Sequence, residues 1–218
     1  MTNIALGFSM IQETEDFIIV DKSPGIDMHD DNGVPGLVSR VSDYLNHKVF
    51  PVHRLDKVTS GIVLLAKHEV ANKALSTAFA NREVEKLYLA ISDKKPKKKQ
   101  GWIKGDMAKS RNGSWKLMHT TENPAITYFQ STNLALPGHR LFFVHPQTGK
   151  THQIRVALKS LGAPILGDTR YAGTEAERVY LHAFRLKFHL MGKEYTAVAW
   201  PAWDEKIDGI DNYKNFIS

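Results

Sequence analysis

The chain has 218 residues, a formal net charge of +6 and no cysteine. This length suits one sizeable core, and the composition does not shift along the chain, so we expect a single domain over residues 1–218. The lack of cysteine excludes disulfides, thiolate metal sites and cysteine nucleophiles, while the positive charge favours a polyanionic partner.

Hydropathy gives no sign of a membrane protein or a secreted one. No apolar run approaches the roughly 18 residues of a membrane span. The first ten residues have neither the basic nor the apolar segment of a signal peptide. We therefore expect a soluble, cytoplasmic protein.

The N-terminal third contains alternating strand and helix patterns. Short β-branched or fully apolar runs bounded by turn residues predict buried strands, and apolar residues spaced three and four apart predict helices. The predicted strands are 17–20, 48–52 and 62–66, and the predicted helices are 37–45 and 70–79. His29, Asp30 and Asp31 suggest a metal site, but no second ligand cluster has suitable spacing, so we interpret them as a solvated loop.

The middle of the chain is basic. Residues 86–91 predict a strand with Tyr88 on the face opposite Leu87 and Leu89. The lysines of 94–99 predict an exposed loop that attracts phosphate. Residues 101–118 look irregular, and their two tryptophans fit either unstacked nucleic acid or a small sheet. Paired strands are expected at 125–130 and 139–144.

A second motif runs from Thr148 to Asp168. Ile154, Leu158 and Leu161 form a helical stripe, which places His152, Arg155 and Lys159 together on an exposed basic face. The Gly149-Lys150-Thr151 triplet lacks the earlier glycine of a phosphate loop, because position 144 is valine, and we reject nucleotide hydrolysis. Strands are predicted at 184–190 and 195–200.

The most concentrated chemistry lies in His53-Arg54-Leu55-Asp56, followed by Lys57-Val58-Thr59-Ser60-Gly61. A loop before a buried strand can aim a carboxylate at a ligand, so Asp56 is the candidate. Taken alone, Arg54 and Asp56 also fit a surface ion pair. The stretch to Lys67, the second motif, and Lys86-x-Tyr88-x-Ala90 together closely resemble the RluA-type pseudouridine synthases, which isomerise uridine in folded RNA.

The resemblance implies an α+β fold with a central mixed, mainly antiparallel sheet and flanking helices. It implies an isomerase that needs no metal, nucleotide or other cofactor. Asp56 is then catalytic, Tyr88 lies against the target base, and Arg155 keeps Asp56 charged and oriented. Arg54 fills the space vacated by the flipped base. The remaining expected RNA and substrate contacts are His53, Lys150, His152, Ile165 and Leu166, with the lysine loop on the RNA backbone.

Some positions depart from the family pattern. Pro24 falls one place late, Ala157 and Ala163 replace histidines, and Lys150 replaces an arginine, which weakens a bidentate RNA contact rather than the chemistry. The short stretch before residue 17 leaves no room for the N-terminal RNA-binding domain of many relatives. We therefore expect this domain, as a monomer, to select structured ribosomal or transfer RNA by shape and basic loops.

Two alternatives remain open. A non-catalytic RNA-binding or RNA-folding protein shares the charge and fold, but the set of Asp56, Tyr88 and Arg155 argues against it. A hydrolase using His53, Asp56 and Ser60 is possible in residue inventory only. The RNA, the target uridine and the detailed role of the aspartate are not determined by the sequence. His182 is interpreted as structural.

Overall fold

The computed structural model describes residues 6–203 and residue 213. These residues form two compact units. The first contains the chain up to residue 86 together with 182–200, and the second contains 87–181 and the residues after 200. The chain passes from one unit to the other within β5 (Glu85–Ser92) and returns at the start of β11 (Leu181–Leu190). The prediction of a single domain stays a prediction.

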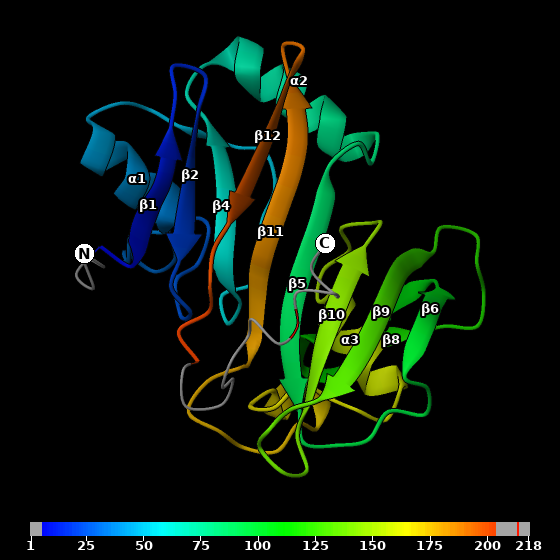
Figure 1. Ribbon diagram of the computed structural model, residues 1–218. Coiled ribbons are helices and arrows are strands. Elements are labelled where there is room, and N and C mark those ends of the chain that lie inside the picture. The colour runs from blue at the N-terminus through cyan, green and yellow to red at the C-terminus, as the bar shows by residue number, and fades with distance from the viewer. Residues whose placement is uncertain (1–5, 204–212, 214–218) are drawn as a thin grey trace. The chain divides into compact units, whose positions relative to one another are not determined.

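The first unit contains a mixed sheet (Figure 1). Strands β4 and β11 run parallel, and the other paired strands in this unit are antiparallel. Every residue of β4 is buried, as its uninterrupted apolar run predicts. The strand order is β1 (Phe8–Glu13), β2 (Phe17–Lys22), β4 (Ser60–Ala66), β11 and β12 (Lys193–Val198), and β3 (Phe50–Pro51) also pairs with β4.

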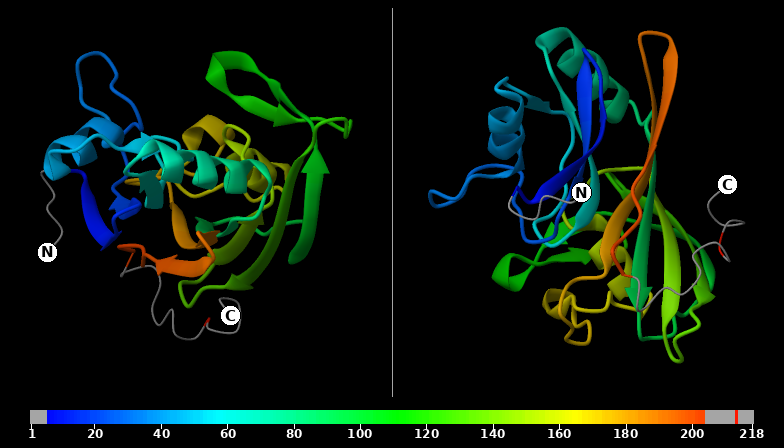
Figure 2. Two further views of the ribbon diagram at one scale, coloured as in Figure 1. Left: turned by 90° about the horizontal axis from the view of Figure 1, so that it is seen from above. Right: turned by 60° about the vertical axis from the view of Figure 1, so that its left-hand side comes forward.

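Two helices cover one face of this sheet, as Figure 2 shows: α1 (Leu37–Leu45) and α2 (Glu69–Ala80). Leu37 and Val41 are the buried positions of α1, and α2 buries Ala71 and Leu75. These residues belong to the apolar stripes expected from the sequence. Both predicted helices are therefore confirmed.

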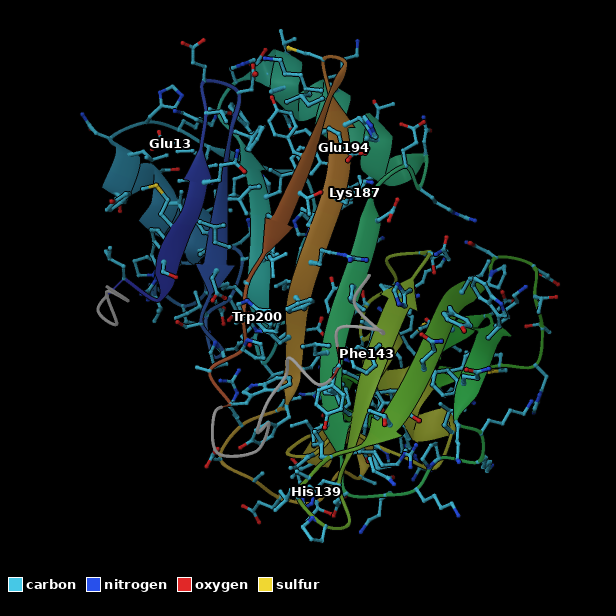
Figure 3. The ribbon with its side chains drawn as sticks, in the orientation of Figure 1. Glu13, His139, Phe143, Lys187, Glu194 and Trp200 are labelled. Atoms are coloured by element: carbon cyan, nitrogen blue, oxygen red, sulfur yellow. The ribbon has the colours of Figure 1, made fainter. Side chains whose placement is uncertain are left out.

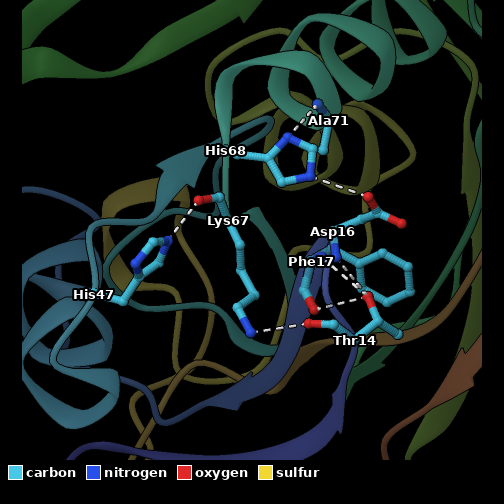
Figure 4. Close-up of polar contacts among 7 residues, drawn as sticks. All are labelled: Thr14, Asp16, Phe17, His47, Lys67, His68 and Ala71. Atoms are coloured by element: carbon cyan, nitrogen blue, oxygen red, sulfur yellow. Dashed lines mark hydrogen bonds and ion pairs between the residues drawn. The ribbon is translucent and has the colours of Figure 1, made fainter.

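The two residues that follow β4, Lys67 and His68, make a group of polar contacts (Figure 4). Lys67 donates from Nζ to Glu13 Oε1 at 2.7 Å and to the Thr14 carbonyl at 2.9 Å. The next residue, His68, is the N-cap of α2, because its Nδ1 accepts the Ala71 N–H. Its Nε2 lies 3.0 Å from Asp16 Oδ1. The Lys-His pair thus connects the strand to both the β1–β2 turn and the helix.

The second unit has an antiparallel sheet in the order β5, β10 (Arg140–Pro146), β9 (Ala125–Asn133) and β6 (Gln100–Gly105). Helix α3 (Gln153–Ser160) packs on β9 and β10. A separate hairpin joins β7 (Met107–Lys109) to β8 (Trp115–Leu117), with the short 3₁₀ helix Arg111–Gly113 between them. A second 3₁₀ helix spans Thr169–Tyr171.

The α+β class with a mixed, mainly antiparallel sheet is confirmed, with three corrections. Residues 101–118 were expected to be irregular, but three strands lie within 100–117, and their glycines and charges hide the alternation. Strand β1 was not predicted, because it is a half-exposed, bulged edge strand. The strand expected at 48–52 shortens to two residues at Pro51, which has no N–H for a ladder.

Among the described helices, none is both long enough and apolar enough to cross a membrane.

Candidate active site

In the first unit, a loop attached to a neighbouring turn carries Asp56. The Thr59 N–H donates to the Asp56 carbonyl at 3.0 Å, and the Gly25 N–H donates to the Lys57 carbonyl at 2.7 Å. Leu55 is buried, Arg54 is exposed, and Asp56 is half-buried. The loop therefore uses its leucine as an anchor and exposes the arginine to solvent.

Lys22 connects the same turn and loop from inside. Its side chain is completely buried, and its ammonium donates to the carbonyls of Ser23, Ile26 and Lys57 at 3.0, 2.9 and 3.3 Å. A buried ammonium needs such acceptors, and charge-assisted hydrogen bonds are stronger than neutral ones. Lys22 is thus a positioning residue for the Asp56 loop, a role that the sequence did not indicate.

His53 holds the other end of the loop as a neutral ring. Its Nε2 accepts the Leu64 N–H at 2.9 Å, so the proton of the ring is on Nδ1, and the ring stacks on Phe79 with centroids 4.7 Å apart. Burial, and then the charge of Lys86, lowers the pKa of His53 to about 3. The observed contacts join the motif to β4 and α2, and the expected RNA contact of His53 stays a prediction.

Gly61 and Ser60 explain the Thr-Ser-Gly part of the motif. Gly61 has φ +111°, and a Cβ there would lie 2.3 Å from the Ala183 carbonyl oxygen, so only glycine fits. Ser60 Oγ and His182 Nδ1 are 2.9 Å apart, and His182 Nε2 lies 2.9 Å from the Ala199 carbonyl. Because Nε2 donates to that carbonyl, Nδ1 accepts the serine hydroxyl.

The hydrolase alternative is therefore wrong in its residue pairing. Ser60 contacts His182 rather than His53, and His53 Nε2 is occupied by a backbone N–H. A serine nucleophile needs an imidazole that a carboxylate orients, and His182 is oriented here by a carbonyl in a buried position. The Ser60–His182 pair is structural.

The second unit contains a buried ion pair at the start of α3. Arg155 donates from Nε to Asp168 Oδ2 and from Nη2 to Asp168 Oδ1, both at 2.8 Å. Only 4% of Arg155 is exposed, which corrects the expected exposed basic face of this helix. The guanidinium also lies 4.9 Å from the centroid of the Tyr171 ring. A bidentate pair of this kind sets the guanidinium plane.

Tyr171 also positions His152. Its hydroxyl accepts the Trp115 N–H at 3.0 Å and lies 2.6 Å from His152 Nδ1. His152 has φ +57°, a left-handed conformation at the N-terminus of α3, and it is not part of the helix itself. One buried tyrosine thus braces both His152 and Arg155.

The profile of the RNA pseudouridylate synthase family matches residues 16–160. The chain belongs to this family. An RNA pseudouridine synthase of Haemophilus influenzae, described as uncharacterized, is 49% identical over 196 residues, which are 88% of this chain and 87% of the relative.

Other comparisons agree with this membership. Ribosomal large subunit pseudouridine synthase C of Rickettsia bellii is 35% identical over 199 residues, which are 85% of this chain and 65% of the relative. The structure of human RNA pseudouridylate synthase domain containing 1 has a TM-score of 0.80 at 21% identity and covers 98% of this chain and 96% of its own, which supports the fold. The predicted family is confirmed. The predicted function, that of an RNA pseudouridine synthase and therefore an isomerase, is confirmed as well.

The other predicted site residues of this synthase lie on fixed backbone of the second unit. Ile165 and Leu166 are buried, and the Leu166 N–H donates to the Ile91 carbonyl of β5 at 2.8 Å. Tyr88, on the same strand, is half-buried opposite Val144. Lys150 donates from Nζ to Asn123 Oδ1 at 2.8 Å. Their substrate contacts stay predictions.

Asp168 and Tyr171 were missed as site residues of the synthase. Asp168 ends the second motif, but the sequence predicts an exposed Arg155 and so gives no reason to expect a buried carboxylate beside its guanidinium. Gly167 before it has φ +83°, and a Cβ there would lie 1.8 Å from the Arg178 carbonyl oxygen. Tyr171 has no sequence signal beyond its type, because only tertiary packing brings it to Arg155.

The His29 to Asp31 loop proves to brace α1. Asp30 Oδ1 accepts the Ser39 hydroxyl at 2.6 Å and the Gly36 N–H at 2.8 Å. These hydrogen bonds, the one from Ser39 first, lower the pKa of Asp30. Within the described part of the chain, no three histidine, aspartate or glutamate side chains are grouped to hold a metal.

Proposed function

We propose that this synthase converts uridine to pseudouridine in structured RNA, with Asp56 as its catalytic residue. The observation that carries the proposal is the Asp56 loop, which is held by Lys22 on one side and His53 on the other. Rigid support is what a catalytic carboxylate requires, since small displacements reduce the rate steeply. The reaction breaks the glycosidic bond at N1 and rejoins the uracil through C5, with no net oxidation or hydrolysis.

Ribosomal or transfer RNA is the proposed substrate, and the names of the relatives favour ribosomal RNA. The Rickettsia relatives are named for the large ribosomal subunit. The net charge of +6 suits an RNA backbone. We include in the proposal a monomer that acts in the cytoplasm, which agrees with the substrate.

The remaining roles follow the family motifs. Tyr88 is proposed to lie against the target uracil. Arg155, whose Nε and Nη2 donate to Asp168, is proposed as the positively charged group that orders the substrate site. Arg54, exposed beside Asp56, is proposed to fill the space that the flipped base leaves. Ile165 and Leu166 are proposed as an apolar pocket wall.

Asp56→Asn tests the catalytic assignment. We expect pseudouridine formation on ribosomal RNA by the purified protein to fall about a thousandfold or more, because asparagine supplies no carboxylate. RNA affinity and thermal stability should stay near those of the wild type. In cells lacking the protein, pseudouridine sites should return with the wild type and not with the variant. Unchanged pseudouridine formation by Asp56→Asn contradicts the assignment.

Arg54→Ala tests base displacement separately. With a fluorescent base at the target position, the wild type should give a base-opening signal on binding, and the variant should give a weaker one at the same occupancy. An unaltered signal counts against this role of Arg54.

A further inference from the structure

A hollow in the second unit contains a concentration of positive charge that the proposed catalytic residues do not use. It has a volume of about 470 Å³ and lies between the lysine loop and the β9–β10 hairpin. Figure 3 shows His139 at the tip of this hairpin. The described residues that line the hollow are Lys95, Lys99, Asn133, Leu134, Pro137, Gly138, His139 and Arg140, and none of them is acidic.

Arg140 is the buried charged residue in the lining of this hollow. It is 9% exposed, and its hydrogen bonds go only to neutral groups: the Asn133 side chain, and the carbonyl and hydroxyl of Ser131. Its buried Nε has no hydrogen-bond acceptor in the structure, and no described carboxylate forms an ion pair with it. A buried guanidinium without a counter-charge is costly, and a bound anion offsets that cost.

The two lysines are held in place by their backbone. Pro96, between them, is buried, and the Lys97 N–H donates to the Leu161 carbonyl at 3.0 Å. The Lys99 carbonyl accepts both the N–H and the hydroxyl of Ser131, at 2.8 and 2.9 Å. Because the loop is fixed, binding an anion orders little backbone, which favours affinity.

The register relates this hollow to the proposed base site within the same unit. Tyr88 pairs with Val144 and Ser92 pairs with Arg140, so these residues lie on one face of the β5–β10 ladder. Four residues along a strand correspond to about 14 Å. A strand of RNA spans this distance in a few nucleotides.

We propose that this hollow binds a backbone phosphate of the RNA substrate, a few nucleotides away from the target uridine. The proposal rests on the proposed function, which supplies the RNA. Arg140 contributes a charged guanidinium to the lining, and Lys95 and Lys99 neutralise the phosphate from the loop. The volume exceeds that of one phosphate, so an attached sugar fits as well.

Charge-matched double variants test the site. The probe is a fluorescein-labelled RNA stem-loop with uridines in its loop, and its affinity is measured by anisotropy over a range of KCl concentrations. Lys95→Gln with Lys99→Gln should weaken binding about tenfold and reduce the salt slope by about one to two. The control, Lys97→Gln with Lys98→Gln, removes the same charge from the same loop outside the hollow and should change affinity less than about threefold. Equal losses in both pairs overturn the proposal.

Arg140→Gln and Arg140→Lys separate anion binding from a purely structural arginine. Both variants lose the planar guanidinium, but lysine keeps the charge. Arg140→Lys should therefore recover part of the RNA affinity that Arg140→Gln loses. Thermal melting identifies any loss of folding. If both variants bind the stem-loop like the wild type, the arginine is structural and the proposal fails.

A tethered crosslinker locates the RNA directly, because the chain has no cysteine of its own. His139→Cys carrying a benzophenone should crosslink to the stem-loop, and Lys98→Cys with the same label should do so much less.

Inorganic phosphate is the probe of a second experiment, which distinguishes free phosphate from RNA. If phosphate alone stabilises the protein through Lys95 and Lys99, while replacing these lysines leaves the RNA affinity unchanged, the site is one for free phosphate and the RNA assignment is wrong.

Turnover separates this proposal from the catalytic one. With ribosomal RNA as substrate, the Lys95→Gln, Lys99→Gln variant should raise KM about tenfold and leave kcat near that of the wild type. If the wild type itself forms no pseudouridine, the proposed function fails, while the affinity comparison still decides whether the hollow binds RNA.

Discussion

The two units hold their functional side chains by different physical means. In the first, the Asp56 loop is positioned indirectly, by a buried lysine that donates to backbone carbonyls and by a neutral histidine that accepts a backbone N–H. In the second, Arg155 is positioned directly, by a buried bidentate carboxylate and an aromatic ring. The first arrangement supports a loop through backbone groups, whereas the second holds the charged side chain itself.

Breaking the Arg155–Asp168 pair should have the largest effect. Asp168→Asn removes a charge that the buried Arg155 guanidinium contacts and should lower the free energy of unfolding by about 3–5 kcal/mol. Pseudouridine formation should be lost with it. Chemical denaturation and a turnover assay measure both. The control is Glu194→Gln, which removes the exposed Lys187–Glu194 pair labelled in Figure 3 and should cost less than about 1 kcal/mol. A loss no larger than that of the control contradicts the comparison.

Removing the lysine of the first unit should have a smaller, mixed effect. Lys22→Met keeps the buried stem but leaves the carbonyls of Ser23, Ile26 and Lys57 without that donor, and should lower stability by about 2–3 kcal/mol. Activity should fall further than stability predicts, since the Asp56 loop loosens. The neighbouring Lys57→Met removes only the exposed pair with Asp27 and is the control. Equal activity in the two variants argues against positioning by Lys22.

The neutral histidine predicts a pH dependence. The pKa of His53 is about 3 in the folded protein against 6.5 for an ordinary histidine, so the unfolded state binds more protons between these values. Stability should therefore fall as the pH drops below 6.5. Between pH 7.5 and 5.5 we expect His53 to account for up to about 1.4 kcal/mol.

His53→Gln should remove this part of the pH dependence, because glutamine offers an acceptor to the Leu64 N–H and does not titrate. His68→Gln, at the more exposed cap of α2, should leave it in place. Urea unfolding at the two pH values measures the difference. An unchanged pH slope in His53→Gln shows that another group is responsible.

Tyr171→Phe should have the smallest effect. It keeps the ring beside Arg155 and removes the hydroxyl that contacts Trp115 N and His152 Nδ1, so we expect a loss of about 1 kcal/mol and a modest rise in KM. If kcat falls as much as in Asp168→Asn, the hydroxyl does more than brace His152. Thermal melting and steady-state kinetics distinguish these outcomes.

Much of the fold could be predicted from local pattern. The fully apolar run of β4 and the spaced apolar residues of α1 and α2 are strong local signals, and each element formed where expected. The strands within 100–117 and the edge strand β1 could not be predicted. They are short and partly exposed, so their apolar alternation is a weak local signal.

The sequence by itself determined the family, the reaction class and the candidate residues, because the chemistry of uridine isomerisation restricts which side chains stand next to each other in its motifs. Only the tertiary structure decided how those residues are supported. Lys22 reaches Lys57 across 35 positions of sequence, Arg155 meets Asp168 and Tyr171, and Arg140 is buried without an acidic partner among the described residues. Such contacts depend on how distant segments pack, and a linear pattern contains no record of that packing.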